Sequence, residues 1–207
     1  MKFLFQIKTI INDNSTLQFL FDRSKSLVLF VPFYLTKEGL DNQTGAEVKP
    51  KIKIDDWGLV YLGASDMKQV SETPGVKETE QDLLKRLEAG CLCLGLKNGS
   101  TIVAHMWCNL SMCDSPLLGF PLKQNEAYLT GARTLEAYKG KNIAPYLRYH
   151  FYKLLHEMGR TELYSVTEYF NKSAIKFKEK LGARQAGFYV HLCFLKRHRT
   201  VILLRRY

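Results

Sequence analysis

The sequence is poor in the features that mark secreted, membrane-spanning and metal-binding proteins. It contains five cysteines, an odd number, and no two of them are spaced as Cys-x-x-Cys. This pattern predicts buried, reduced thiols rather than a set of disulfides or a zinc site. The five histidines also lack the His-x-x-x-His spacing of metal-binding helices, so we expect no metal.

Long apolar runs are also missing. No stretch approaches the length of a transmembrane helix. The opening residues 1–11 are interrupted by Gln6 and Lys8, which leaves too short an apolar core for a signal peptide. We therefore expect a cytoplasmic protein without a transmembrane segment. Internal repeats and low-complexity tracts are absent as well, which excludes solenoid and array architectures.

Acidic residues are the scarcer charge. There are 20 of them against 30 lysines and arginines, which gives a net charge of +10. Such a chain attracts phosphates, an acidic carrier protein, nucleic acid or an anionic membrane surface. Nucleic acid is the less favoured partner, because the basic residues flank apolar strand residues and do not form the open, aromatic-interleaved face of a known nucleic-acid module.

What the sequence does have is enough apolar material for one domain. Its 207 residues are 46% hydrophobic and 24% charged, so the chain can bury a single sizeable core. We predict one domain over residues 1–207, with a less clearly patterned N-terminal part at 1–78 and a C-terminal strand at 196–207.

Residues 138–159 contain the most informative pattern, a basic loop followed by an amphipathic helix. Apolar residues recur at helical spacing after Asn142, Pro145 falls in the first turn, and Gly159 follows the last apolar position. A strand pattern at 126–135 precedes the loop. Because the first backbone N–H groups of a helix lack intrahelical partners, this junction can bind an anion such as phosphate.

A second helix follows at residues 171–183, with Asn171 as the predicted N-cap and Gly182 as the stop. A strand at 161–169 lies between the two helices, and strands at 185–195 and 200–207 follow them. The order β-α-β-α-β-β predicts an α/β fold.

The earlier part of the chain gives weaker signals. A helix is predicted at 78–88, and Asn98-Gly99 marks a hairpin between two strand patterns. Further upstream, 16–24 has a helical pattern, 26–36 reads as a buried strand interrupted by a proline, and 37–51 is loop-rich. Aromatic residues in this region can pack in the core or shape an acceptor pocket: Phe19, Phe21, Phe30, Phe33, Tyr34 and Trp57.

Two of these segments together resemble the GNAT superfamily of acyl-CoA-dependent N-acyltransferases. The family signature Arg/Gln-x-x-Gly-x-Gly/Ala falls on residues 139–144 (KGKNIA), and a second family pattern resembles 171–183 (NKSAIKFKEKLGA). The resemblance extends over roughly 79–195. The chain departs from the family wording at four positions: Lys139 replaces Arg, Asn142 replaces the central Gly, Lys178 stands where a Tyr often serves as general acid, and Ala183 replaces Phe.

The resemblance implies a fold and a donor. The fold would be the GNAT acyltransferase α/β fold, with a mixed, mostly antiparallel central sheet, a splay between its fourth and fifth strands, and helices on both faces. The donor would be acetyl-CoA or another acyl-CoA. Its phosphates would meet Lys139, Gly140, Lys141, Asn142, Ile143 and Ala144, and its pantetheine arm would lie along Arg133, Thr134 and Leu135 and near Asn171. Asn at position 142 tolerates the left-handed backbone that Gly adopts.

The implied reaction is direct acyl transfer to a primary amine of a small molecule. Such a reaction needs a base, for which Glu126 is the first candidate, and an acid, for which Tyr164 and Tyr169 are candidates. Three alternatives stay open: a longer acyl chain, an acidic acyl carrier protein as donor, and a binding module that has lost its chemistry. The sequence also leaves open whether the chain forms a homodimer, and acceptor recognition is expected in the early region.

Overall fold

The computed structural model describes residues 28–40, 48–194 and 198–207. The helix expected at 16–24, including Phe19 and Phe21, lies outside these residues. Within them the strands are β1 (Val28–Glu38), β2 (Gly58–Tyr61), β3 (Leu92–Asn98), β4 (Thr101–Asn109), β5 (Met112–Asp114), β6 (Gly119–Pro121), β7 (Glu126–Thr134), β8 (Glu162–Glu168), β9 (Arg184–Phe194) and β10 (His198–Arg206). The α-helices are α3 (Met67–Ser71), α4 (Glu80–Glu88), α5 (Ile143–Glu157) and α6 (Lys172–Glu179), and short 3-10 turns occupy η1 (Ala64–Asp66) and η2 (Glu136–Tyr138).

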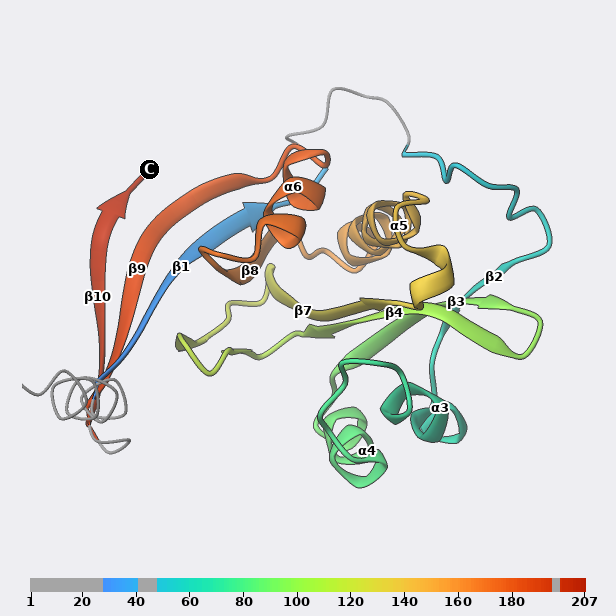
Figure 1. Ribbon diagram of the computed structural model, residues 1–207, viewed down its shortest axis with the longest axis horizontal. Helices are drawn as coiled ribbons and strands as arrows, with labels where there is room; N and C mark the ends of the chain where they lie inside the picture. The colour runs from blue at the N-terminus through green and yellow to red at the C-terminus, as the bar shows by residue number, and fades with distance from the viewer. Residues whose placement is uncertain (1–27, 41–47, 195–197) are drawn as a thin grey trace, which may run out of the picture.

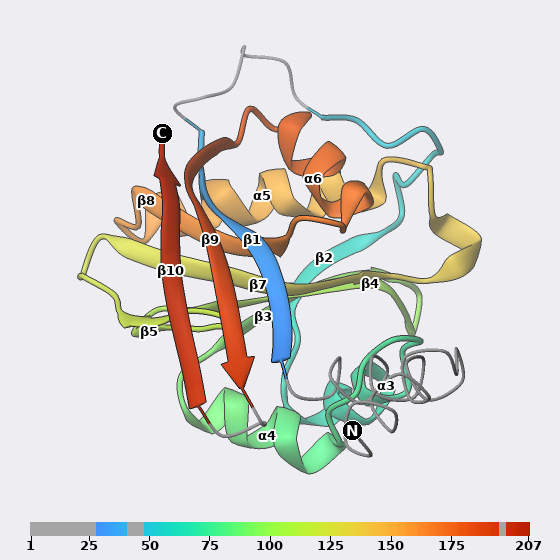
Figure 2. The same cartoon turned by 60° about the vertical axis from the view of Figure 1, so that its left-hand side comes forward.

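The main sheet has eight strands in the order β10-β9-β1-β8-β7-β4-β3-β2, and β5 and β6 form a separate hairpin. Neighbouring strands of this sheet are antiparallel except for β7 and β8, which are parallel and connected through α5. Helices α5 and α6 lie on one face of the strongly twisted sheet and α3 and α4 on the other (Figures 1 and 2). The predicted mixed, mostly antiparallel α/β fold is confirmed.

Two apolar cores hold the helices against the sheet. Under α5, Leu147, Phe151 and Leu155 are fully buried among strand residues such as Leu129 and Leu163. On the other face, residues of α3 and α4 pack on β3 and β4 through Met67, Val70, Leu83, Cys93 and Trp107. Each large apolar side chain buried in this way stabilises the fold by about 1.5 to 3 kcal/mol.

Capping residues and glycines in the sequence predicted where most of the helices begin and end. Thr79 caps α4, with its hydroxyl accepting a hydrogen bond from the backbone N–H of Asp82. The predicted hairpin joins β3 and β4 through Gly99, whose φ is +58°. All five cysteines are buried and free, as the sequence predicted. None of the helices in the described ranges is both long and apolar enough to cross a membrane.

The first strand differs from its prediction. β1 continues through Lys37 and Glu38, which the sequence placed in a loop-rich segment, and it inserts between β8 and β9. Pro32 does not break it, because the ladder to β8 begins only at the next residue, where Phe33 faces Glu168. The insertion places Phe33 and Glu38 in the interior, both at 1% exposure or less, whereas Phe30 is 60% exposed.

Candidate active site

A cavity of about 520 Å³ opens where β7 and β8 separate. The parallel ladder between them covers only Glu126 to Tyr128 on β7 and Glu162 to Tyr164 on β8. Beyond this short ladder, the second half of β7 and the end of β8 form opposite walls of the cavity. Residues of α4, α5 and α6, of the connection between α3 and α4, and of the connection between β5 and β6 complete the lining. The cavity therefore reaches from one face of the sheet to the other.

The β7 wall contains a β-bulge. His105 of β4 faces Arg133 and Trp107 faces Thr130, so Met106 opposes two residues, Gly131 and Ala132. Gly131 has a φ of +60°, and a Cβ added there would lie 3.1 Å from the Trp107 ring. A bulge leaves one residue outside the ladder and re-aims the backbone, as is common next to active sites. This position therefore requires glycine.

The loop before α5 has the backbone that the sequence predicted. Gly140 has a φ of +76°, and Asn142, the N-cap of α5, is left-handed with φ 60° and ψ 20°. The Asn142 side chain does not cap the helix and instead accepts a weak hydrogen bond from Lys180 Nζ at 3.4 Å. The first turn of α5 is therefore left without a side-chain cap. The backbone N–H of Lys51 donates to the Lys141 carbonyl at 2.9 Å, which ties the segment before β2 to this loop.

The predicted coenzyme-contacting residues fall into three groups. Arg133 and Asn171 line the cavity, whereas the residues at 139–144 lie at the start of α5 and do not line it. Asn171 also caps α6, since its Oδ1 accepts a hydrogen bond from Ala174 N at 3.1 Å. Thr134 and Leu135 follow the bulge at the end of β7, and Leu135 N donates to the Val103 carbonyl at 2.9 Å on the β4 side. Leu135 therefore bonds toward β4, and neither Thr134 nor Leu135 lines the cavity.

The structure brings two of the three predicted acid–base residues together. Glu126 and Tyr164 meet at the beginning of β7 and β8, where burial first, and then the Glu126 carboxylate, raise the pKa of Tyr164. Glu126 also accepts a hydrogen bond from Lys123 N at 2.8 Å. Tyr169 lies apart, with its ring against Tyr34. None of the three lines the cavity.

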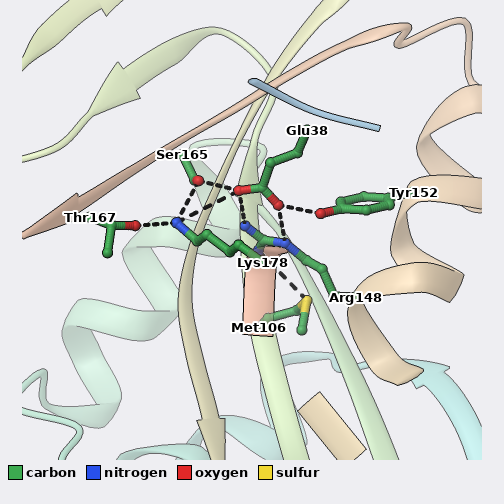
Figure 3. Close-up of polar contacts among 7 residues, drawn as sticks. All are labelled: Glu38, Met106, Arg148, Tyr152, Ser165, Thr167 and Lys178. Carbon is green, nitrogen blue, oxygen red and sulfur yellow. Dashed lines mark hydrogen bonds and ion pairs between the residues drawn. The ribbon is translucent and has the colours of Figure 1, made fainter. Parts of the chain in front are cut away.

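Six residues that the sequence did not bring together form a buried polar cluster beside the cavity (Figure 3). The Glu38 cluster, as we name it, consists of Glu38, Arg148, Tyr152, Ser165, Thr167 and Lys178. Arg148 donates two hydrogen bonds of 2.9 Å to the Glu38 carboxylate, one to each oxygen. The hydroxyls of Tyr152 and Ser165 also donate to Glu38. The carboxylate is therefore fully coordinated, although it is only 1% exposed.

Lys178 of α6 is the second cation of the Glu38 cluster. Its ammonium donates to Ser165 Oγ at 2.6 Å and to the hydroxyl of Thr167, and it lies 3.7 Å from Glu38 Oε1. Lys178, Arg148 and Thr167 also line the cavity. These three residues of the cluster therefore form part of the wall of the cavity.

The charges of the Glu38 cluster set its protonation states. Burial alone would raise the pKa of Glu38, but the positive charges of Arg148 and Lys178 lower it to about 2. Burial lowers the pKa of Lys178 to about 8; Glu38 opposes this shift and Arg148 adds to it. With Glu38 ionised and both cations charged, the cluster has one more positive than negative charge.

The sequence signals for this cluster are charged residues that occupy apolar positions of their helices. Arg148 is only 1% exposed, and it lies three, four and seven residues before buried Phe151, Tyr152 and Leu155. Lys178 likewise sits three residues before buried Leu181. A charged residue on an apolar helix stripe requires a buried partner. No sequence pattern near Arg148 or Lys178 identified Glu38 as that partner.

Comparison with known proteins places the fold. A search of curated protein sequences found no match. Among solved structures, the chain is similar to a GNAT-family protein from Novosphingobium aromaticivorans DSM 12444, with 18% identity, a TM-score of 0.56, and coverage of 79% of this chain and 64% of that one. A GNAT-family acetyltransferase from Colwellia psychrerythraea is 17% identical, with a TM-score of 0.55, and the match covers 79% of this chain and 56% of that one. A GCN5-related N-acetyltransferase from Sphaerobacter thermophilus is 14% identical, with a TM-score of 0.56, and the match covers 93% of this chain and 58% of that one.

These identities support the fold alone, and the chain spans only 56% to 64% of the length of the three structures. The sequence match is more specific. Residues 60–183, more than half of the chain, match the family model described as the acetyltransferase (GNAT) family. The two helix starts and the opened strand pair lie inside this range. The chain therefore belongs to the GNAT family of acetyltransferases.

Proposed function

We propose that this protein transfers an acyl group from coenzyme A to a primary amine. The observations that carry the proposal are the cavity between the separated ends of β7 and β8 and, outside its lining, the left-handed loop at the start of α5. The cavity offers a path for the acyl-bearing arm, and the loop lies where β7 ends. Family membership supports an acyl-CoA donor.

The loop suits the phosphates of the donor. Ile143 and Ala144 present backbone N–H groups at the start of α5, with the positive end of the helix dipole behind them. Lysines surround this position: Lys139 and Lys141 in the loop, and the exposed Lys49, Lys51 and Lys53 in the segment that hydrogen-bonds to the loop. This environment favours an anionic group such as a pyrophosphate.

The exposed edge of β7 suits the pantetheine arm. Because the ladder to β8 stops after Tyr128, the side of residues 133–135 that faces β8 has no strand partner within the part of the chain that the structure describes. An extended amide-containing arm can hydrogen-bond to such an edge as an added strand would. Asn171 and Arg133, both in the cavity lining, are positioned to contact the arm.

The bulge in β7 offers a group for the chemistry. Attack of an amine on the thioester carbonyl creates an oxyanion, which a backbone N–H stabilises. We assign this role to the N–H groups at Gly131 and Ala132, since the bulge removes one residue from the ladder to β4. Glu126 is our candidate base, acting through water, with Tyr164 and Tyr169 retained as candidate acids.

The acceptor would enter from the side of α3 and α4. This wall contains Lys77 and Arg133 beside Arg86, which pairs with Glu78 at 3.3 Å and lies over the Trp107 ring at 4.4 Å. Cations outnumber acids on this side, so an amine that also has a carboxylate fits it better than a polyamine.

The test is an aminolysis assay. Purified protein is incubated with acetyl-CoA and a panel of small primary amines, with and without carboxylates, while thiol release and the mass of the acylated amine are measured. Acylation of at least one amine with matching thiol release is the expected result. Binding of acyl-CoA without transfer to any amine would favour the binding module, and use of an acyl carrier protein alone would favour the carrier-dependent alternative suggested by the net charge of +10.

A further inference from the structure

The outer edge of the terminal strand β10 is open within the part of the chain that the structure describes. β10 ends the eight-stranded sheet and pairs with β9 on its other side. Figures 1 and 2 show it at the outer end of the sheet, beyond β9 and β1. An open strand edge presents a row of backbone N–H and C=O groups that can pair with another strand. This edge can therefore accept one further strand.

The centre of β10 is apolar and exposed. Four consecutive residues, Val201, Ile202, Leu203 and Leu204, are 39% to 56% exposed. Side chains of a strand point alternately to the two faces of the sheet, so apolar groups are exposed on both faces. An exposed apolar strand at a sheet edge is an aggregation hazard when nothing covers it. The apolar centre of β10 is therefore a candidate interaction surface.

The two neighbouring strands extend this surface on one face of the sheet. Across the ladders, Ile202 faces Val190, and Phe30 of β1 faces Leu192. Residues two apart on one strand share a face, so Ile202, Phe30 and Phe194 lie on the same face. Phe30 and Phe194 are 60% and 48% exposed. The apolar surface therefore continues from β10 across β9 to β1.

Arginines lie at both ends of the apolar centre. Arg199 precedes it, Arg205 and Arg206 follow it, and all three are exposed. The Arg205 guanidinium lies 4.7 Å from the centre of the Tyr207 ring. No ion pair among the described residues involves any of the three arginines. The open edge is therefore positive at both ends and apolar between them.

We propose that the open edge of β10 binds an extended peptide segment of another protein, with an apolar centre between acidic ends. The segment would add a strand to the sheet, and its backbone would hydrogen-bond to the edge. Its apolar side chains would pack on residues 201–204, and its carboxylates would pair with the three arginines. Among the described residues, none of β10 lines the cavity between β7 and β8. The inference therefore concerns a second surface and does not depend on the proposed function.

The regular part of β10 sets the length of the added strand. Residues from His198 to Leu203 pair with β9 without interruption, and the register shifts between Leu203 and Arg205. A bulge of this kind turns an edge away from a partner. The added strand would therefore pair along residues 198–203, and Arg205 and Arg206 would contact its end through their side chains. Because both ends of β10 are basic, the charges fit acidic ends in either strand direction.

The same features disfavour two other occupants of the edge. A second copy of the chain, paired antiparallel about a two-fold axis at Ile202, would place Arg199 of one copy opposite Arg205 of the other. Like charges directly opposite each other destabilise a sheet. An anionic lipid surface would attract the arginines, but hydrocarbon offers no partner for the N–H and C=O groups of the edge. An acidic peptide strand supplies the charge, the apolar contact and the hydrogen bonds together.

Synthetic peptides test the proposal on the wild-type protein. The first has Val-Ile-Val-Ile between two Asp-Glu pairs, and the second has the same centre between two Lys-Lys pairs. The third is the acidic peptide with its central backbone nitrogens methylated. Binding of each labelled peptide is followed by fluorescence anisotropy. We expect saturable, salt-sensitive binding of the acidic peptide and at least about tenfold weaker binding of the other two, which lose the charge pairs or the backbone hydrogen bonds.

Charge reversal on the protein tests the same pairing from the other side. One variant combines Arg199→Glu, Arg205→Glu and Arg206→Glu, and it should lose the acidic peptide and bind the lysine-ended peptide instead. Its control makes the same total change in charge at exposed lysines of other elements, Lys68→Glu, Lys85→Glu and Lys153→Glu. The control should keep the preference of the wild type for the acidic peptide.

The remaining outcomes overturn the proposal. Equal binding of the acidic peptide and either of the other two would show adsorption to apolar residues without strand addition or charge pairing. Sedimentation with phosphatidylserine vesicles, without binding of the acidic peptide, would assign the edge to a lipid surface. A wild-type dimer in analytical ultracentrifugation, again without peptide binding, would assign it to a second copy. The comparison of the three peptides on the wild type decides the matter even if a variant does not fold.

Discussion

Glu38 and Arg148 lie 110 residues apart in the chain and form a two-pronged ion pair whose N–O distances are both 2.9 Å. This pair joins β1, which inserts between β8 and β9, to the central helix α5. It also holds the carboxylate that faces Lys178. One contact therefore connects β1 and α5 to the wall of the cavity, which Arg148 lines.

Replacing Glu38 by Gln should destabilise the protein by about 3 to 5 kcal/mol, because it leaves the buried Arg148 without its counter-ion. The measurement is urea unfolding at neutral pH. The control is Glu162→Gln, whose partner Lys37 is 45% exposed; a partly exposed pair should cost about 1 kcal/mol or less. Equal losses in the two variants would contradict the importance assigned to the buried pair.

Stability should fall in acid because of the same carboxylate. The pKa of Glu38 is about 2 in the folded protein, below its ordinary value of 4.5. A lowered pKa gives a stability contribution that is present above pH 4.5 and is lost as the pH falls toward 2, amounting to about 3 kcal/mol. Unfolding midpoints measured across this window should fall more steeply for wild type than for Glu38→Gln. Parallel curves would show that other groups dominate.

The bulge in β7 should tolerate no side chain. Gly131→Ala places a Cβ 3.1 Å from the Trp107 ring at a φ of +60°, which we expect to cost about 2 kcal/mol or more and to lower acyl transfer by displacing the backbone N–H groups. Gly63→Ala is the control, because its φ is −101° and nothing lies within 4 Å of the new Cβ. Thermal unfolding and transfer rates report the two effects. A fully active Gly131→Ala would remove the bulge from the mechanism.

The loop assignment can be tested at the two ends of α5. Gly140→Glu and Gly159→Glu introduce the same side chain at φ values of +76° and +77°, both in open space, so the backbone strain of about 1 to 2 kcal/mol is matched. About 20 Å of helix separates them. Only Gly140→Glu places a carboxylate at the phosphate position, so only this variant should lose coenzyme A binding in a calorimetric titration. Loss of binding in both, or in neither, would count against the loop.

The elements that the sequence predicted well have strong local signals. Pro145 and Gly159 bound α5, Asn171 caps α6, and Gly99 turns the β3–β4 hairpin. The left-handed backbone at Asn142 followed from the tolerance of asparagine for that conformation. Interactions within a few residues determine each of these features, so a single sequence contains the necessary information.

The features that escaped prediction depend on strand order and distant pairing. The insertion of β1 between β8 and β9 brings Glu38 to Arg148 and Lys178, and no local pattern specifies that neighbour relation. The bulge at Gly131 is set by its register against Met106 of β4, which is also nonlocal. The sequence therefore predicted the left-handed turn before α5 but not the Glu38 cluster, and the coenzyme contacts assigned to the loop, Arg133 and Asn171 stay predictions.

The most direct test of the account is a calorimetric titration of the wild-type protein with acetyl-CoA, free coenzyme A and a long-chain acyl-CoA. The account predicts saturable binding of acetyl-CoA or the longer acyl-CoA, with the preference between them reporting the acyl length that the cavity accepts. Absence of binding to all three, in a protein shown to be folded, would contradict the assignment of the α5 loop and the β7–β8 cavity to coenzyme A.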